Sequence, residues 1–151
     1  MALSSNDARF FTDPCYVYHF GNAYESGKAT IIDGMLASVC TLMPDKNGNV
    51  ASRRDAQAHL NRWTMNLKSN TISSSKIDTL TGEFPRFDER FNGYQYNHLY
   101  MGANPNIENL FDRIVHYNLL SGNRQDHIFN ESIPSEPIFT PRSGNEGDGY
   151  L

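Results

Sequence analysis

Short segments rich in aromatic and β-branched residues recur along the chain and are separated by polar turns. Residues 15–20 and 29–32 have this composition and flank the polar turn 25–28, so they predict a β-hairpin. A second hairpin is predicted where residues 59–67 alternate apolar and polar side chains, with one slip, before the polar turn 68–70. Its second strand and the further predicted strands comprise residues 71–72, 76–77, 94–101, 114–120 and 137–139. This pattern is typical of an antiparallel all-β protein, either a sandwich or a propeller.

Two segments do not follow the strand pattern, and the last residues begin a further strand. Residues 33–44 could form a short helix, but Gly34 and the β-branched Val39 weaken a helix, so we predict a buried crossover. Residues 45–58 are polar and predict a surface loop. Residues 148–151 have the pattern of a turn followed by the start of a strand, so the chain is expected to end inside a larger β domain.

Composition and charge narrow the classes of partner. The chain has 151 residues, with 13 Lys and Arg against 17 Asp and Glu, and a formal charge of −4. This balance argues against a nucleic-acid partner. The longest apolar stretch, residues 31–43, is interrupted by polar residues and is shorter than the roughly 20 apolar residues of a bilayer helix. Residues 1–7 lack a secretory pattern, and Cys15 and Cys40 form no metal or disulfide motif, so a reducing, cytoplasmic compartment is expected.

One segment begins like a calcium-binding loop. Residues 45–49 have the expected opening, but Val50 stands where the loop requires Gly, and Ala56 stands where it requires Glu. A turn at Asn47-Gly48 is therefore the better interpretation.

Histidines and two glutamates are the remaining candidates for chemistry. The five histidines do not form a local metal-binding pair, so spacing alone favours packed or surface imidazoles for His19, His59, His98, His116 and His127. His19 differs from the others because it lies in an aromatic strand and precedes Asn22-Ala23. Glu83 and Glu136 each precede a short apolar segment that contains Pro. Burying a carboxylate in such surroundings costs free energy unless the charge is paired. From these residues alone, a surface Glu at a strand edge is the favoured interpretation.

Three segments, taken together and in this order, resemble the carotenoid oxygenase family. The first contains His19-Phe20-Gly21-Asn22-Ala23, and the second contains Glu83-Phe84-Pro85-Arg86 followed by Asp88-Glu89-Arg90. The third comprises residues 135–142 with the terminal residues 148–151. The resemblance covers nearly the whole chain but only the C-terminal part of a family member. It implies that residues 1–151 are the C-terminal part of a carotenoid oxygenase domain.

The resemblance also implies a fold and a metal site. Members form a seven-bladed β-propeller in which four histidines from different blades hold a non-haem Fe²⁺, so this chain is expected to form the C-terminal blades of an incomplete propeller. His19 matches the third ligand. Glu83 and Glu136 match carboxylates that accept a ring N–H from ligand histidines, and we expect Glu83 to pair with His19. The other three ligands match no residue of this chain: two would precede it and one would follow Leu151.

The implied activity is a dioxygenase that cleaves a conjugated carbon–carbon double bond to two carbonyl products. Its expected partners are dioxygen and an apolar conjugated substrate of the carotenoid, apocarotenoid or stilbene type, and the motifs are closest to the lignostilbene and bacterial carotenoid-cleaving branches. With one ligand of four, the isolated chain is expected to be inactive. The alternative is a non-catalytic scaffold or interaction module whose exposed strand edges bind the missing blades or a second copy. These residues leave contact with a membrane surface undetermined.

Overall fold

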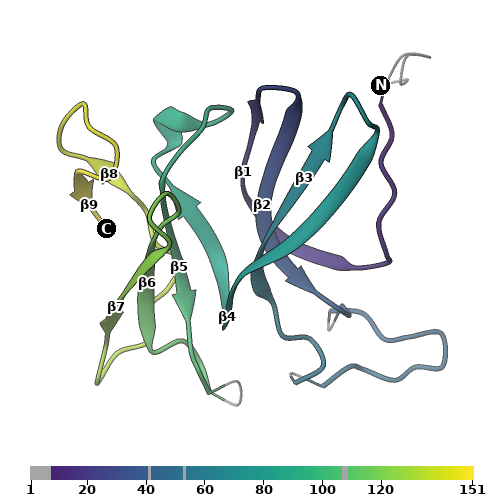
Figure 1. Cartoon of the computed structure of the whole chain (residues 1–151). Coiled ribbons are helices and arrows are strands. Elements are labelled where there is room, and N and C mark those ends of the chain that lie inside the picture. The colour runs from purple at the N-terminus through teal and green to yellow at the C-terminus, as the bar shows by residue number, and fades with distance from the viewer. Residues whose placement is uncertain (1–7, 41, 53, 107–108) are drawn as a thin grey trace.

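Seven antiparallel strands follow one another in chain order and form two twisted sheets that share one long strand, as the computed structural model in Figure 1 shows. The structure describes residues 8–40, 42–52, 54–106 and 109–151. The first sheet contains β1 (Tyr16–Ser26), β2 (Ala29–Ala37), β3 (His59–Asn66) and the first part of β4 (Thr71–Phe87). The second contains the last part of β4, β5 (His98–Ala103), β6 (Arg113–Asn118) and β7 (Asn123–Ile128). The predicted all-β class is therefore confirmed.

Two short elements complete the fold. A single 3-10 turn, η1 (Glu89–Phe91), follows β4, and a separate two-stranded sheet joins β8 (Thr140–Pro141) to β9 (Gly149–Tyr150). The strand start predicted at the end of the chain is thus confirmed, whereas the strand predicted at 137–139 is displaced to β8. In the part of the chain that the structure describes, no helix is long and apolar enough to cross a membrane.

Both predicted hairpins are present. In the first, Ser26 pairs with Ala29 across a turn in which Gly27 has a φ of 62°, a conformation that glycine adopts without strain. In the second, Asn66 pairs with Thr71, and Asn70 has a φ of 53°. The predicted surface loop after β2 is also confirmed, and the Asp45 carboxylate there accepts the backbone N–H groups of Asn47 and Asn49, as a turn requires.

The crossover predicted for residues 33–44 is wrong at its beginning, because β2 continues to Ala37. Asp33 is fully buried in this strand and accepts two hydrogen bonds from Arg62, each 2.7 Å long, and one from the Tyr96 hydroxyl, also 2.7 Å. These partners lie 29 and 63 residues away in the sequence, so the local pattern does not reveal that the charge is compensated. Gly34 is also a residue of β2, where a Cβ would lie 3.1 Å from the His19 carbonyl oxygen, so the absence of a side chain allows β1 to approach closely.

Strand β7 was not predicted, because all six of its residues are exposed and it has no apolar periodicity. Its charged side chains hold it in place. The Asp126 carboxylate forms an ion pair with the guanidinium of Arg113 in β6, at 3.0 Å. The Arg124 guanidinium forms an ion pair with Asp78 of β4, at 2.8 Å. Ion pairs across the sheet thus replace apolar packing in this strand.

One cluster of buried side chains joins the two sheets. The fully buried apolar members are Met35, Leu60, Leu99, Met101, Ala103 and Val115. Asn22 adds a polar connection between β1 and the segment around η1, because its amide donates to the carbonyl oxygens of Phe91 and Tyr94 at 3.0 Å each and its oxygen accepts the Gly93 N–H. A buried amide is stable only when its polar atoms are satisfied in this way.

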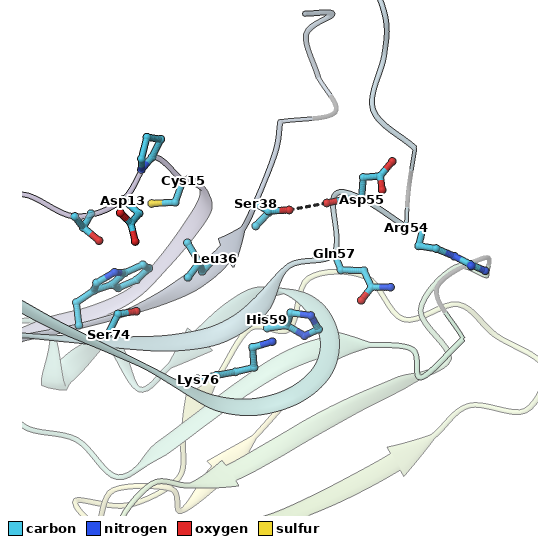
Figure 2. A pocket seen from close by; sticks show the side chains of 14 residues that line it. Asp13, Cys15, Leu36, Ser38, Arg54, Asp55, Gln57, His59, Ser74 and Lys76 are labelled. Carbon is cyan, nitrogen blue, oxygen red and sulfur yellow. Dashed lines mark hydrogen bonds between the residues drawn. The ribbon is translucent and has the colours of Figure 1, made fainter.

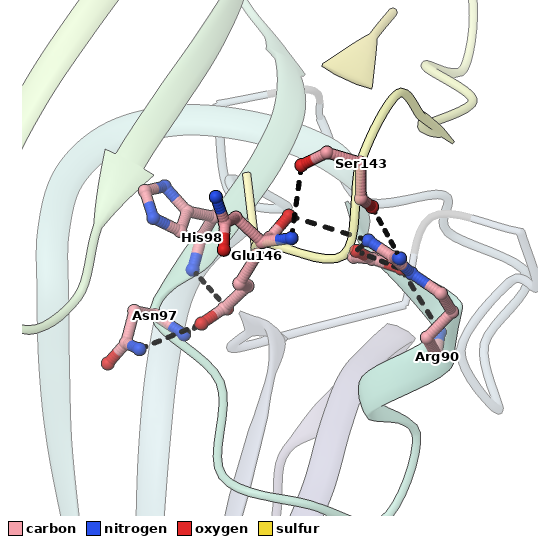
Figure 3. Close-up of polar contacts among 7 residues, drawn as sticks. Arg90, Asn97, His98, Ser143 and Glu146 are labelled. Atoms are coloured by element: carbon pink, nitrogen blue, oxygen red, sulfur yellow. Dashed lines mark hydrogen bonds and ion pairs between the residues drawn. The ribbon is translucent and has the colours of Figure 1, made fainter. Parts of the chain in front are cut away.

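The C-terminal segment is fastened to the second sheet by polar contacts, which Figure 3 shows. Arg90 donates to the Ser143 carbonyl oxygen at 2.7 Å. The Glu146 carboxylate accepts the Asn97 amide at 2.8 Å and the His98 backbone N–H at 3.0 Å. Residues 143–146 therefore lie against η1 and the start of β5.

Candidate metal-ligand site

His19 and Glu83 meet between the two sheets, 64 residues apart in the sequence. His19 lies on β1, and Glu83 lies on the part of β4 that pairs with β5. The His19 Nδ1 atom is 2.7 Å from Glu83 Oε2, which is the pairing predicted for these side chains. The Glu83 side chain is 17% exposed and the His19 side chain is 50% exposed, so the carboxylate is largely buried and the imidazole is accessible.

Both residues lie at irregular points of their strands. The pairing of β1 with β2 shifts between Val17 and Phe20, and the pairing of β4 with β5 shifts between Glu83 and Arg86. Each shift places one extra residue in the strand, as a β-bulge does. Bulges change the direction of side chains and are common next to functional sites. His19 lies within the first irregular stretch and Glu83 at the start of the second.

The Glu83 carboxylate is held firmly but incompletely satisfied. Its Oε2 atom accepts the Phe84 N–H at 2.9 Å in addition to the His19 contact. Its Oε1 atom is buried and has no hydrogen-bond partner among the described residues. Burial raises the pKa of the Glu83 carboxyl above its ordinary value, while the Phe84 N–H and the His19 ring oppose that rise. Buried acceptors without partners are rare and point to functional sites.

The arrangement suits one ligand of a metal ion. With the carboxylate ionised and the imidazole neutral, this contact would place the ring proton on Nδ1 and leave a lone pair on Nε2, because an ionised carboxylate can only accept a hydrogen bond. Histidines that bind metals are oriented by such a carboxylate. The described part of the chain contains no group of three or more His, Cys, Asp or Glu residues that could hold a metal ion. The residues present therefore fit one ligand, and the other ligands would have to come from elsewhere.

Glu136 has a different partner. Its carboxylate lies 3.1 Å from the Arg86 Nε atom, and about two fifths of each side chain is exposed. Arg86 also lies 3.8 Å from the Glu89 carboxylate. The role of Glu136 beside a ligand histidine stays a prediction.

The structure brings two further histidines together that spacing did not connect. His98 on β5 and His116 on β6 are 2.8 Å apart between Nδ1 and Nε2, and their rings are stacked. The strand register explains the contact, because Tyr100 pairs with His116 and places His98 diagonally opposite. His127 instead packs against Phe129.

We expect the His116→Gln variant to lose less stability in acid than the wild-type chain. Burial lowers the pKa of His116 below its ordinary value of 6.5, and His98 contributes in the same direction while Gln125 opposes it. The folded chain therefore binds fewer protons at this ring than the unfolded chain, so stability falls as the pH drops through about 6.5. Urea unfolding above and below this pH measures the effect. An unchanged pH dependence in the variant would contradict it.

A cavity of about 490 Å³ lies on the first sheet, and Figure 2 shows the side chains that line it. Its lining includes Cys15, Leu36, His59 and Lys76. Burial, followed by the nearby Lys76 ammonium, lowers the pKa of His59. The cavity mixes basic and acidic side chains and contains neither candidate metal-site residue.

Comparison with known proteins gives a consistent set of relatives. The family model described as retinal pigment epithelial membrane protein matches residues 2–151. Lignostilbene-alpha,beta-dioxygenase isozyme III of Sphingomonas paucimobilis is 31% identical over 99% of this chain and 35% of its own length. This chain thus spans about a third of that relative.

Solved structures show the same fold. The lignostilbene dioxygenase of Pseudomonas brassicacearum superposes with a TM-score of 0.79 and 28% identity, covering 93% of this chain and 33% of that chain. Cobalt-substituted apocarotenoid oxygenase of Synechocystis has a TM-score of 0.76 and 26% identity, covering 89% of this chain and 29% of that chain. These structures are β-propellers, so the two sheets are blades of an incomplete propeller, as predicted.

Proposed function

Because this chain belongs to the carotenoid oxygenase family, we propose that it supplies part of an oxygenase that cleaves a conjugated carbon–carbon double bond to two carbonyl products. Its relatives are enzymes named for stilbene and apocarotenoid substrates. The observation that carries the proposal is the 2.7 Å contact between His19 and Glu83, which orients an accessible imidazole at the junction of two blades.

In this proposal His19 contributes Nε2 as one ligand of Fe²⁺. When bound, the iron supplies the activation of dioxygen that cleavage of the alkene requires. Glu83 holds the proton on Nδ1 and keeps the ring facing one way. Glu136 is proposed to support another ligand histidine from outside this chain, on the strength of the family resemblance.

Residues 1–151 are proposed to be the C-terminal part of a carotenoid oxygenase domain. The remaining ligands would then come from further blades, either of the same polypeptide or of an associated one. The substrate is proposed to be an apolar conjugated alkene of the carotenoid, apocarotenoid or stilbene type, and dioxygen is the second reactant. The isolated chain is proposed to bind iron too weakly for activity, because it offers one imidazole.

The experiment is a chimera in which this chain replaces the matching third of the Pseudomonas brassicacearum lignostilbene dioxygenase. We expect the chimera to hold iron and to cleave a stilbene, and we expect His19→Ala to abolish both. His127→Ala, on the exposed strand β7, is the matched control and should leave both unchanged. Iron and activity that survive His19→Ala would contradict the proposal. A folded chimera that binds no iron would favour the alternative of a non-catalytic scaffold. Stoichiometric, tightly bound iron in the isolated chain would refute its predicted weak binding.

A further inference from the structure

We propose that Phe84, which contacts the His19 ring, and Phe111, which packs against Phe84 and over Gly102, are positioning residues that fix the orientation of the His19 imidazole. The importance of these contacts for function rests on the proposed role of His19 as a metal ligand. The contacts themselves lie within this chain and can be tested without metal.

Phe84 forms one wall beside the imidazole. The centroids of the Phe84 and His19 rings are 5.2 Å apart, with 49° between the ring planes. Phe84 has a φ of 60°, which is uncommon for a residue with a side chain and marks a local backbone constraint. The same backbone geometry aims the Phe84 N–H at Glu83 Oε2, at 2.9 Å. One residue therefore holds the carboxylate with its backbone and contacts the imidazole with its ring.

Phe111 packs against Phe84. The two rings meet edge to face, with centroids 5.9 Å apart and an interplanar angle of 89°. This geometry is favourable for aromatic pairs. The contacts thus run from Phe111 through Phe84 to His19.

Gly102 makes room for Phe111. A Cβ atom at Gly102 would lie 2.9 Å from Phe111 Cδ2, closer than real Cβ contacts. Gly102 is also the register partner of Glu83 across β4 and β5. The bare backbone at this position therefore allows Phe111 to pack directly on β5, the strand paired with the one that carries the carboxylate.

The packing of Phe84 against His19 matters because the His19 side chain is half exposed. The hydrogen bond to Glu83 fixes one nitrogen of the His19 ring. Because 50% of the His19 side chain is exposed to solvent, one hydrogen bond alone would not prevent the ring from changing rotamer. Packing against Phe84 restricts that movement. Preorganised ligands need such support from neighbouring side chains.

The test uses long-range ¹H–¹⁵N NMR spectra of the His19 ring in the 151-residue chain, at a pH above the titration range of histidine. The wild-type chain should show the Nδ1–H tautomer alone and proton contacts between the His19 and Phe84 rings. Gly102→Ala and Phe111→Ala should average the two ¹⁵N shifts toward each other and weaken those ring contacts. Phe111→Leu should restore much of the wild-type pattern, because it returns an apolar side chain to the same place.

Gly144→Ala is the matched control, since a Cβ there meets nothing within 4 Å. It should leave the His19 signals unchanged. If Gly102→Ala does not fold, the comparison of Phe111→Ala with Phe111→Leu decides. A wild-type tautomer pattern in folded Phe111→Ala would overturn the inference. This readout involves no iron, so it is independent of the chimera result that tests the proposed function.

Discussion

The Asp33→Ala variant is expected to lose about 3–5 kcal/mol of unfolding free energy. The Asp33 carboxylate is fully buried and is the acceptor for a bidentate pair with Arg62 and for the hydroxyl of Tyr96. Tyr96 is 2% exposed, so its hydroxyl would lose its acceptor inside the core, and the Arg62 guanidinium would lose its counter-charge. Removing one partner of a buried ion pair costs more than the pair itself contributes.

Urea unfolding of the variant and the wild-type chain measures this loss. Asp13→Ala is the control, because Asp13 lies in the exposed N-terminal segment, and it should change stability by less than about 0.5 kcal/mol. The double variant Asp33→Ala/Arg62→Met should recover part of the loss, since it no longer leaves an unpaired charge. A loss below about 1 kcal/mol in Asp33→Ala would show that the buried charge is compensated in another way.

Glu83→Gln in the chimeric oxygenase is expected to weaken iron binding about 10- to 100-fold. The substitution keeps the size of the side chain but removes the negative charge that holds the His19 Nδ1–H at 2.7 Å. Titration of the metal-free chimera with Fe²⁺ gives the affinity. Glu25→Gln, at the exposed end of β1, is the control and should retain wild-type affinity.

The Glu136→Gln variant tests whether both carboxylates that the family resemblance assigns to the site, Glu83 and Glu136, affect iron binding. A loss of iron affinity as large as that of Glu83→Gln would support the assignment of Glu136 to another ligand histidine. Unchanged affinity would instead identify its 3.1 Å contact with Arg86 as its main role. An unchanged affinity in Glu83→Gln itself would contradict the role of Glu83.

Local sequence patterns identified those strands whose side chains alternate or cluster by type. The turn around Gly27 and the alternation from Leu60 to Leu67 predicted the first two hairpins correctly. The pattern did not identify the end of β2, because Asp33 is compensated by residues distant in the sequence. It also missed β7, where ion pairs take the place of an apolar face.

The candidate site could not be predicted from spacing. His19 and Glu83 are 64 residues apart, and only the resemblance of their motifs to a known family connected them. Periodicity also did not predict the contact between Gly102 and Phe111, which depends on the register of β5 with β6. Sites assembled from different strands become visible only when the strand pairing is known.

Strand β4 belongs to both blades, so local unfolding of one blade affects the other. Its first part is hydrogen-bonded to β3, and its last part, which carries Glu83, is hydrogen-bonded to β5. Opening of either blade therefore disturbs β4. A fragment that contains all four strands of one blade would also remove β4 from the other blade. The two blades should behave as one cooperative unit, and the imidazole–carboxylate pair keeps its geometry only while both remain closed.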